Sequence, residues 1–219
     1  FKKGLQLYSS GVMIMENCAD LLPDCFRFVR GVVDSQDLSL NISRELLQQT
    51  RELKRIAGQL EKKIKAELLR LLENDRENYE KFYAAFGKQL KYGLVSDYGM
   101  HKELLQDLVE FHSAKEQKLV TLKEYVAAMP ESQKHIYFAT GASAKIPQTK
   151  LLLDRGFDVL LLTEQVDEFI PQTVGKYEEH EFRNILTDDL ELSTDEEKKA
   201  AEEAAEQFKS CVDFMKETL

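Results

Sequence analysis

The sequence lacks the long apolar run that a membrane-spanning helix needs. Such a span takes about 20 uninterrupted apolar residues, and no window of the 219-residue chain approaches that length. No signal peptide leads the chain, which opens with Phe1 rather than Met, so we expect that its start has been removed. We therefore predict a cytoplasmic protein with no membrane partner.

Cysteine is scarce, and so are the residue spacings that hold metals. Cys18, Cys25 and Cys211 are scattered without a CxxC pair, which argues against a disulfide framework or a zinc site. Their simplest interpretation is as free thiols in or near cores. The histidines also lack the close spacing of metal ligands, so we predict no metal site.

The chain also lacks the patterns of nucleic-acid binding and of self-contained catalysis. Its formal net charge is −9, and no basic patch is interleaved with aromatic residues, so nucleic acid is not expected as a partner. The sequence contains no GxxxxGK[ST], GxGxxG, HExxH or GxSxG motif. A small enzyme complete in itself is therefore poorly supported.

A long amphipathic pattern predicts a helix over residues 44–73. Ser43 is a suitable N-cap residue, and no proline interrupts the pattern. Apolar residues recur every three, four or seven positions and form one stripe, the expected core face. Its members are Leu46, Leu53, Ala57, Leu60, Ile64, Leu68 and Leu71.

A cationic strip falls opposite that stripe and includes Arg44, Arg51, Arg55 and Lys62, together with Gln48. An ordinary solvated face has this appearance. A guanidinium at a helix start, however, sits poorly with the positive end of the helix dipole, so Arg44 favours an external partner. Arg44 and Gln48 are one turn apart and can touch a single target.

The rest of the pattern indicates an α/β fold. Residues 4–15 predict a strand or hairpin, residues 21–33 a helix, and residues 75–110 a helical block that breaks around 93–99. Beyond residue 119, helices alternate with apolar runs, as in a βαβ sheet. The helices are expected near 122–129 and 148–154, and the apolar runs are 135–139, 157–162 and 181–186.

The C-terminal tail has a different composition. Residues 187–197 carry six acids and no base, which is typical of a solvated linker. An apolar stripe follows, from Ala201 through Phe208 to Leu219, and predicts a final helix that needs a partner to cover it.

Several long stretches resemble one known family. GVVDSQDLSLNISRELLQQ (31–49) resembles the catalytic loop in the middle domain of the ninety-kilodalton heat-shock chaperones, especially the bacterial high-temperature protein G type. The further similar stretches, in the family's order, are LYSSGVMIMENCADLLPDCFRFVRG (7–31), ENYEKFYAAFGKQLKYG (77–93), LVTLKEYVAAMPESQKHIYFATG (119–141) and RGFDVLLLTEQVDEF (155–169). The resemblance covers nearly the whole chain.

The resemblance implies an architecture of two αβα layers joined by a helical coil, followed by an acidic linker and a C-terminal helix. On this basis residues 1–74 are the C-terminal part of the large αβα subdomain with the catalytic loop, and residues 75–110 are the connecting coil. Residues 111–187 are the small αβα subdomain. Residues 188–219 are the linker and the first helix of the C-terminal dimerisation domain.

The resemblance also implies a function. ATP with Mg²⁺ is held mainly by a separate N-terminal domain, and Arg44 of this chain reaches the γ-phosphate, with Gln48 beside it and Asn41 in the loop that positions both. Ser39 replaces a proline common in relatives. The intact protein is expected to be a homodimeric ATPase that binds unfolded clients, and the chain alone is expected to be inactive.

Two further points stay open at this stage. Met13 is a candidate client contact, although methionine and aromatic residues near the first strands are more often core. Without the resemblance, the pattern would equally suit a non-catalytic interaction scaffold of helices and strands.

Overall fold

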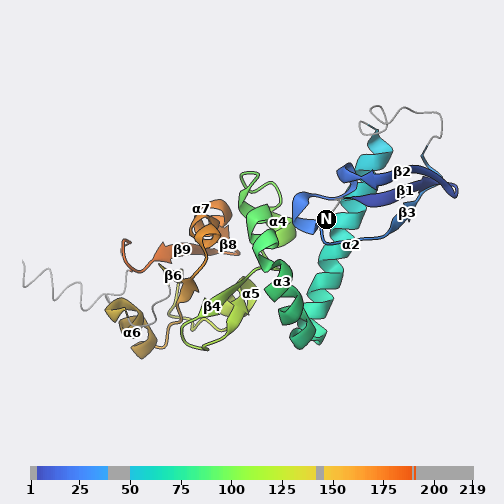
Figure 1. The fold of residues 1–219 in the computed structure, drawn as a ribbon. Helices are drawn as coiled ribbons and strands as arrows, with labels where there is room; N and C mark the ends of the chain where they lie inside the picture. The colour runs from blue at the N-terminus through green and yellow to red at the C-terminus, as the bar shows by residue number, and fades with distance from the viewer. Residues whose placement is uncertain (1–3, 39–49, 142–145, 189, 191–219) are drawn as a thin grey trace, which may run out of the picture. The chain divides into compact units, whose positions relative to one another are not determined.

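The computed structural model describes residues 4–38, 50–141, 146–188 and 190 (Figure 1). The chain divides into two compact units, Phe1–Leu186 and Thr187–Leu219. The first unit is a mixed α/β fold and is described below. The predicted linker lies largely outside the described residues, and the predicted final helix lies entirely outside them. The four-part division of the chain stays a prediction.

The strand or hairpin predicted over residues 4–15 is a hairpin. Strands β1 (Leu5–Ser9) and β2 (Val12–Cys18) pair antiparallel, and the turn between them has φ of 49° at Ser10 and 79° at Gly11. Positive φ at both central residues is the geometry whose twist matches that of paired strands. Strand β3 (Val32–Asp34) lies parallel to β1 and completes a sheet of order β2-β1-β3.

The helix predicted over residues 21–33 is wrong. This stretch forms two short 3₁₀ turns, η1 (Ala19–Leu21) and η2 (Asp24–Phe26), and then runs into β3. Pro23 lies between the turns, and proline disfavours helical backbone at the residue before it. Leu22 accordingly has extended φ and ψ of −141° and 140°.

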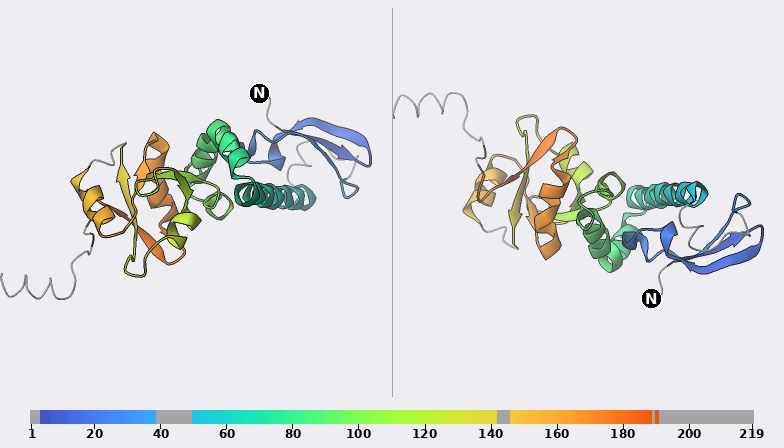
Figure 2. Two further views of the ribbon diagram at one scale, coloured as in Figure 1. Left: turned by 90° about the horizontal axis from the view of Figure 1, so that it is seen from below. Right: turned by 90° about the horizontal axis from the view of Figure 1, so that it is seen from above.

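The long helix exists but begins later than predicted. Helix α2 spans Arg51–Asn74, and its N-cap is Thr50, with an extended ψ of 146°, rather than Ser43. The Thr50 side chain accepts a hydrogen bond from the Leu53 amide at 3.3 Å, so the helix starts where a side chain satisfies a free N–H group. Figure 2 shows α2 running alongside the three-stranded sheet.

The helical block after α2 is confirmed. Helix α3 (Arg76–Val95) is capped by Asp75 and packs against α2 and η2, and α4 (Lys102–Leu105) follows a turn. The predicted aromatic side of α3 faces the core, with Tyr79 and Leu90 fully buried.

The remaining elements form a six-stranded sheet of order β5-β4-β7-β6-β9-β8. Strand β6 (Ile136–Thr140) is parallel to both β7 (Leu160–Leu162) and β9 (His180–Asn184), as the predicted βαβ arrangement requires. The predicted helices appear as α5 (Leu122–Ala127) and α6 (Pro147–Asp154). The sequence pattern missed β4 (Glu110–Ser113), β5 (Leu119–Thr121), β8 (Lys176–Tyr177), η3 (Gln165–Phe169) and α7 (Ile170–Val174).

One continuous cluster of buried apolar residues links the first sheet, the helices and the second sheet, from Leu5 and Leu7 through Leu53 and Tyr79 to Leu160. Among the described residues, no helix is both long enough and apolar enough to cross a membrane.

Candidate functional site

The predicted catalytic residues Asn41, Arg44 and Gln48 fall in segment 39–49, outside the described residues. Their roles stay predictions. The structure does describe the two ends between which this segment runs, together with the start of α2.

The first end is fixed by the three-stranded sheet. The Ser9 hydroxyl donates a 2.6 Å hydrogen bond to the Leu38 carbonyl, and both residues are buried. The Gly11 amide in the hairpin turn donates to Asp34 Oδ2 at 3.0 Å. The Ser9–Leu38 bond is buried and holds the backbone in place, because breaking it leaves unpaired polar groups, whereas the Gly11–Asp34 bond is exposed. The chain therefore reaches residue 38 in a defined position.

The second end is fixed by the capped start of α2. Thr50 caps the helix, and Leu53, three residues on, is only 1% exposed. Because the helix begins at Arg51, the expected cationic strip is not one uninterrupted helical face running from Arg44 to Lys62. Arg51 and Arg55 belong to the first turns of α2, and Arg44 precedes the cap.

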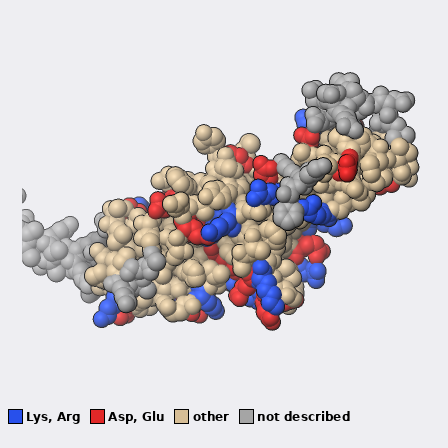
Figure 3. Space-filling model, viewed as in Figure 1, with Lys and Arg blue, Asp and Glu red and all other residues tan. Residues whose placement is uncertain are grey.

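An ion pair links the two ends. Arg55 Nη2 lies 2.6 Å from Asp37 Oδ2, and both side chains are more than half exposed. An exposed pair of this type contributes at most about 1 kcal/mol. Asp37, Arg51, Glu52 and Arg55 line a polar hollow of about 420 Å³. Basic and acidic side chains are also interspersed elsewhere on the face seen in Figure 3.

The candidate client contact Met13 is 48% exposed on β2, beside Val12, which is 52% exposed. Of the nearby methionine and aromatic residues, Met15 and Phe26 are buried in the core and Phe28 is half-buried. The structure therefore separates Met13 from the core residues, and its role in client binding stays a prediction.

Sequence reasoning missed a buried ionic network around α3. Arg76 at the start of α3 reaches Glu110 on β4 and Glu124 on α5, each at 2.6 Å. The Arg76 guanidinium also donates to the Leu119 carbonyl at 3.0 Å. Glu110 is 0% exposed, and burial raises its pKa to about 7 against the opposing effect of Arg76.

A buried cation, Lys91, lies about one turn before the end of α3. Lys91 Nζ is 2.7 Å from Asp167 and 3.3 Å from Glu164, and it stands 4.9 Å above the centre of the Phe111 ring. Lys91 and Asp167 are both almost completely buried. The side chain of each buried acid in this network therefore has a cationic partner, and the geometry suits a structural link between α3 and the second sheet rather than acid and base catalysis.

The sequence did contain a signal for these residues. Lys91 falls on the apolar stripe of α3 that includes Tyr83 and Leu94, and Glu110 interrupts the run of Leu108, Val109 and Phe111. A charge at a position that the periodicity assigns to the core indicates a buried pair, because an unpaired buried charge is too costly.

The described cysteines, Cys18 and Cys25, are buried free thiols, as expected. Burial raises the pKa of the Cys25 thiol to about 12, so it is a poor nucleophile at neutral pH. Across the part of the chain that the structure describes, no group of three or more His, Cys, Asp or Glu side chains is placed to hold a metal ion.

Comparison with known proteins gives a consistent result. The family model described as Hsp90 protein matches residues 1–219. The chain is 52% identical over 223 residues to Chaperone protein HtpG of Bacillus subtilis, with 100% of the chain and 36% of that relative covered. It is 55% identical over 223 residues to the HtpG of Clostridium acetobutylicum, covering 100% of the chain and 35% of the relative. The HtpG of Oceanobacillus iheyensis is 54% identical over 207 residues, covering 93% of the chain and 33% of the relative.

The chain thus spans about a third of the length of the relatives it matches.

Proposed function

Because the chain belongs to the Hsp90 family, we propose that it is the middle region of a chaperone ATPase and supplies an arginine to ATP held by a separate N-terminal domain. The observation that carries the proposal is the stretch GVVDSQDLSLNISRELLQQ (31–49), which resembles the catalytic loop of that region. The absence of the nucleotide-binding motifs sought in the sequence supports a split site.

The chemistry assigns a role to each candidate residue. Transfer of the γ-phosphoryl group to water requires neutralisation of charge on the phosphate oxygens. Arg44 supplies a planar, permanently charged fork when the dimer closes. Gln48 orients the arginine or the phosphate by hydrogen bonding, and Asn41 helps to position the loop. ATP arrives with Mg²⁺, and both are held mainly by the N-terminal domain.

The described ends of the loop support this assignment. Leu38 is tied to β1, Thr50 caps α2, and Arg55 pairs with Asp37 across the two ends. These contacts fix residues 38 and 50, the described residues between which the proposed catalytic loop runs.

The same proposal includes client binding and assembly. Met13 and Val12 offer exposed apolar surface on β2, to which an unfolded client can bind. The tail beyond residue 187 would lead into a dimerisation domain, and the intact protein would act as a cytoplasmic homodimer.

The alternative is a non-catalytic interaction scaffold. The split-site proposal and the scaffold alternative are distinguished by mixing the chain with an ATP-loaded N-terminal domain and measuring ATP turnover. The split-site proposal predicts hydrolysis that depends on Arg44, whereas a scaffold gives none. Calorimetry on the isolated chain is the companion test, because micromolar ATP binding there would place the nucleotide site within this chain and overturn the proposal.

A further inference from the structure

Asp107, which follows α4, joins two distant elements through its carboxylate. Its Oδ2 accepts a 2.6 Å hydrogen bond from Lys65 Nζ on α2, and its Oδ1 accepts a 2.9 Å bond from the Tyr177 hydroxyl on β8. The two donors lie 42 and 70 residues away along the chain. Each carboxylate oxygen therefore has its own donor, and we call Lys65, Asp107 and Tyr177 the Asp107 clasp.

The Asp107 clasp is shielded from water. Tyr177 is buried, and the side chains of Lys65 and Asp107 are only 22% and 25% exposed. Burial and the hydrogen bond to Asp107 raise the pKa of Tyr177, so its hydroxyl keeps the proton that it donates. Salt screens such contacts less than it screens a surface ion pair, and removal of one partner leaves the others unpaired.

Helix α4 strengthens the link on both sides. Lys65 Nζ also donates to the Glu103 carbonyl, and Lys102 Nζ donates to the carbonyl of Val174, the last residue of α7. Leu105 is fully buried, so α4 cannot shift without exposing apolar surface. It is therefore a fixed bridge between α2 and the segment that leads from α7 into β8.

Helix α2 depends on such contacts for its direction. Of its 24 residues, only Leu53 and Leu68 are buried. Lys65 lies roughly 22 Å along the helix axis from the cap at Thr50. Because an uninterrupted helix bends only gently over this distance, a contact that holds Lys65 also fixes the direction of the first turns.

We propose that Asp107 is a positioning residue for ATP hydrolysis. The Asp107 clasp holds the direction of α2, and with it the point at Thr50 where the proposed catalytic loop joins that helix. This inference rests on the proposed function, since it concerns the same reaction, and Asp107 acts through Lys65 without touching ATP. Loss of the clasp slows phosphoryl transfer, which depends on the placement of the reacting groups. ATP affinity, set in a separate domain, stays nearly unchanged.

The test is single-turnover ATP hydrolysis in the full-length protein that carries this chain, with the ATP dissociation constant measured separately by calorimetry. Asp107→Asn keeps the shape of the side chain and removes its charge. It is expected to lower the rate about threefold or more, with the dissociation constant within about twofold of wild type. Lys65→Met should act similarly, whereas Lys65→Arg should retain more of the rate because it keeps a charged donor for Asp107.

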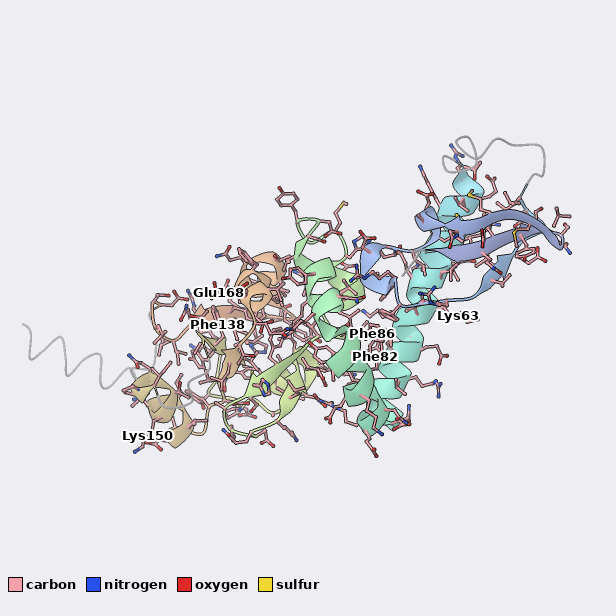
Figure 4. The ribbon with its side chains drawn as sticks, in the orientation of Figure 1. Lys63, Phe82, Phe86, Phe138, Lys150 and Glu168 are labelled. Atoms are coloured by element: carbon pink, nitrogen blue, oxygen red, sulfur yellow. The ribbon has the colours of Figure 1, made fainter. Side chains whose placement is uncertain are left out.

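The matched control is Lys63→Met. Lys63 is an exposed lysine on the same helix (Figure 4), and its loss should leave the rate within about twofold of wild type.

A double-mutant cycle identifies the contact responsible. Adding Lys65→Met to Asp107→Asn should slow the reaction little further, because both substitutions break the same contact. Tyr177→Phe removes only a hydroxyl group and covers the case in which the other variants do not fold. It should also lower the rate without changing ATP affinity.

Arg44→Ala in the same assay separates this inference from the proposed function. If Arg44→Ala slows hydrolysis while the clasp variants match wild type, the inference is overturned and the proposed function stands. If Arg44→Ala does not slow hydrolysis, the proposed function fails and the inference fails with it. Equal losses of rate and of ATP affinity in the clasp variants would also overturn the inference, because the clasp would then serve only the fold.

Discussion

Arg76 at the start of α3 holds the fully buried carboxylate of Glu110 on β4, with Nη2 and Oε1 2.6 Å apart. The pair joins the helical block to the edge region of the second sheet. Desolvating both charges is costly, and their attraction offsets that cost only while both partners are present.

Removing the arginine should therefore destabilise the fold strongly. We expect Arg76→Ala to lower the free energy of unfolding by roughly 3 kcal/mol or more, because Glu110 is left buried without its cation. Urea unfolding followed by circular dichroism measures this. Arg70→Ala is the matched control. Arg70 pairs with Glu67 on the surface, so this substitution is expected to change the free energy of unfolding by no more than about 0.5 kcal/mol. Equal costs would show that the buried pair does not stabilise the fold.

The raised pKa of Glu110 predicts a pH effect of definite sign. Its carboxyl has a pKa of about 7 in the folded chain against 4.5 for the ordinary group. The folded state therefore takes up the proton more readily, and the resulting stability is complete below pH 4.5 and is lost as the pH rises through about 7. Arg76, Lys91, Glu80 and Glu124 are the charged groups acting on it.

The measurement compares the free energy of unfolding of the wild type with that of Glu110→Gln, whose side chain cannot titrate. Urea unfolding is followed at several pH values between 4.5 and 7 and at several above 7. Wild type should gain stability relative to the Gln variant as the pH falls through this window. A gap that is constant with pH would contradict the raised pKa.

Gly93 allows α3 to approach η2 closely. A Cβ at position 93 would lie 2.4 Å from the Cβ of Cys25, so Gly93→Ala should destabilise the chain by about 1–3 kcal/mol through overpacking. Gly58→Ala on α2 is the control, because nothing lies within 4 Å of its added Cβ. There alanine's higher helix propensity should stabilise by up to about 1 kcal/mol. Thermal melts of both variants test this, because the melting temperature should fall for Gly93→Ala and rise for Gly58→Ala.

The sequence predicted the features that depend on local periodicity. Such features include the hairpin and the aromatic side of α3. They also include the alternation of helices and strands from α5 to β7, because each of these elements has its own apolar pattern. The start of α2 was misplaced because the apolar stripe continues on both sides of Thr50, and a cap within a continuous pattern leaves the periodicity unchanged. The prediction of a helix over residues 21–33 was wrong because it took no account of Pro23.

Other features depend on contacts between distant residues. Strands β4 and β5 are short, and they are stabilised by pairing with each other and, for β4, with β7. The partners of Arg76 and Lys91 lie on other elements, so no local pattern could name them. For the candidate site, the structure adds the anchored ends of segment 39–49, while the roles of Asn41, Arg44 and Gln48 still rest on the resemblance.

The central proposal is tested most directly by single-turnover ATP hydrolysis in the full-length protein that carries this chain, with and without Arg44. Arg44→Ala should lower the rate by more than roughly tenfold, about 1.4 kcal/mol of barrier, with little change in ATP affinity. Arg44→Lys should rescue poorly because an ammonium lacks the planar fork. Arg55→Ala, which breaks only the described pair with Asp37, should stay close to wild type. Near-normal turnover in Arg44→Ala, with loss of turnover in Arg55→Ala or Arg51→Ala, would contradict the assignment.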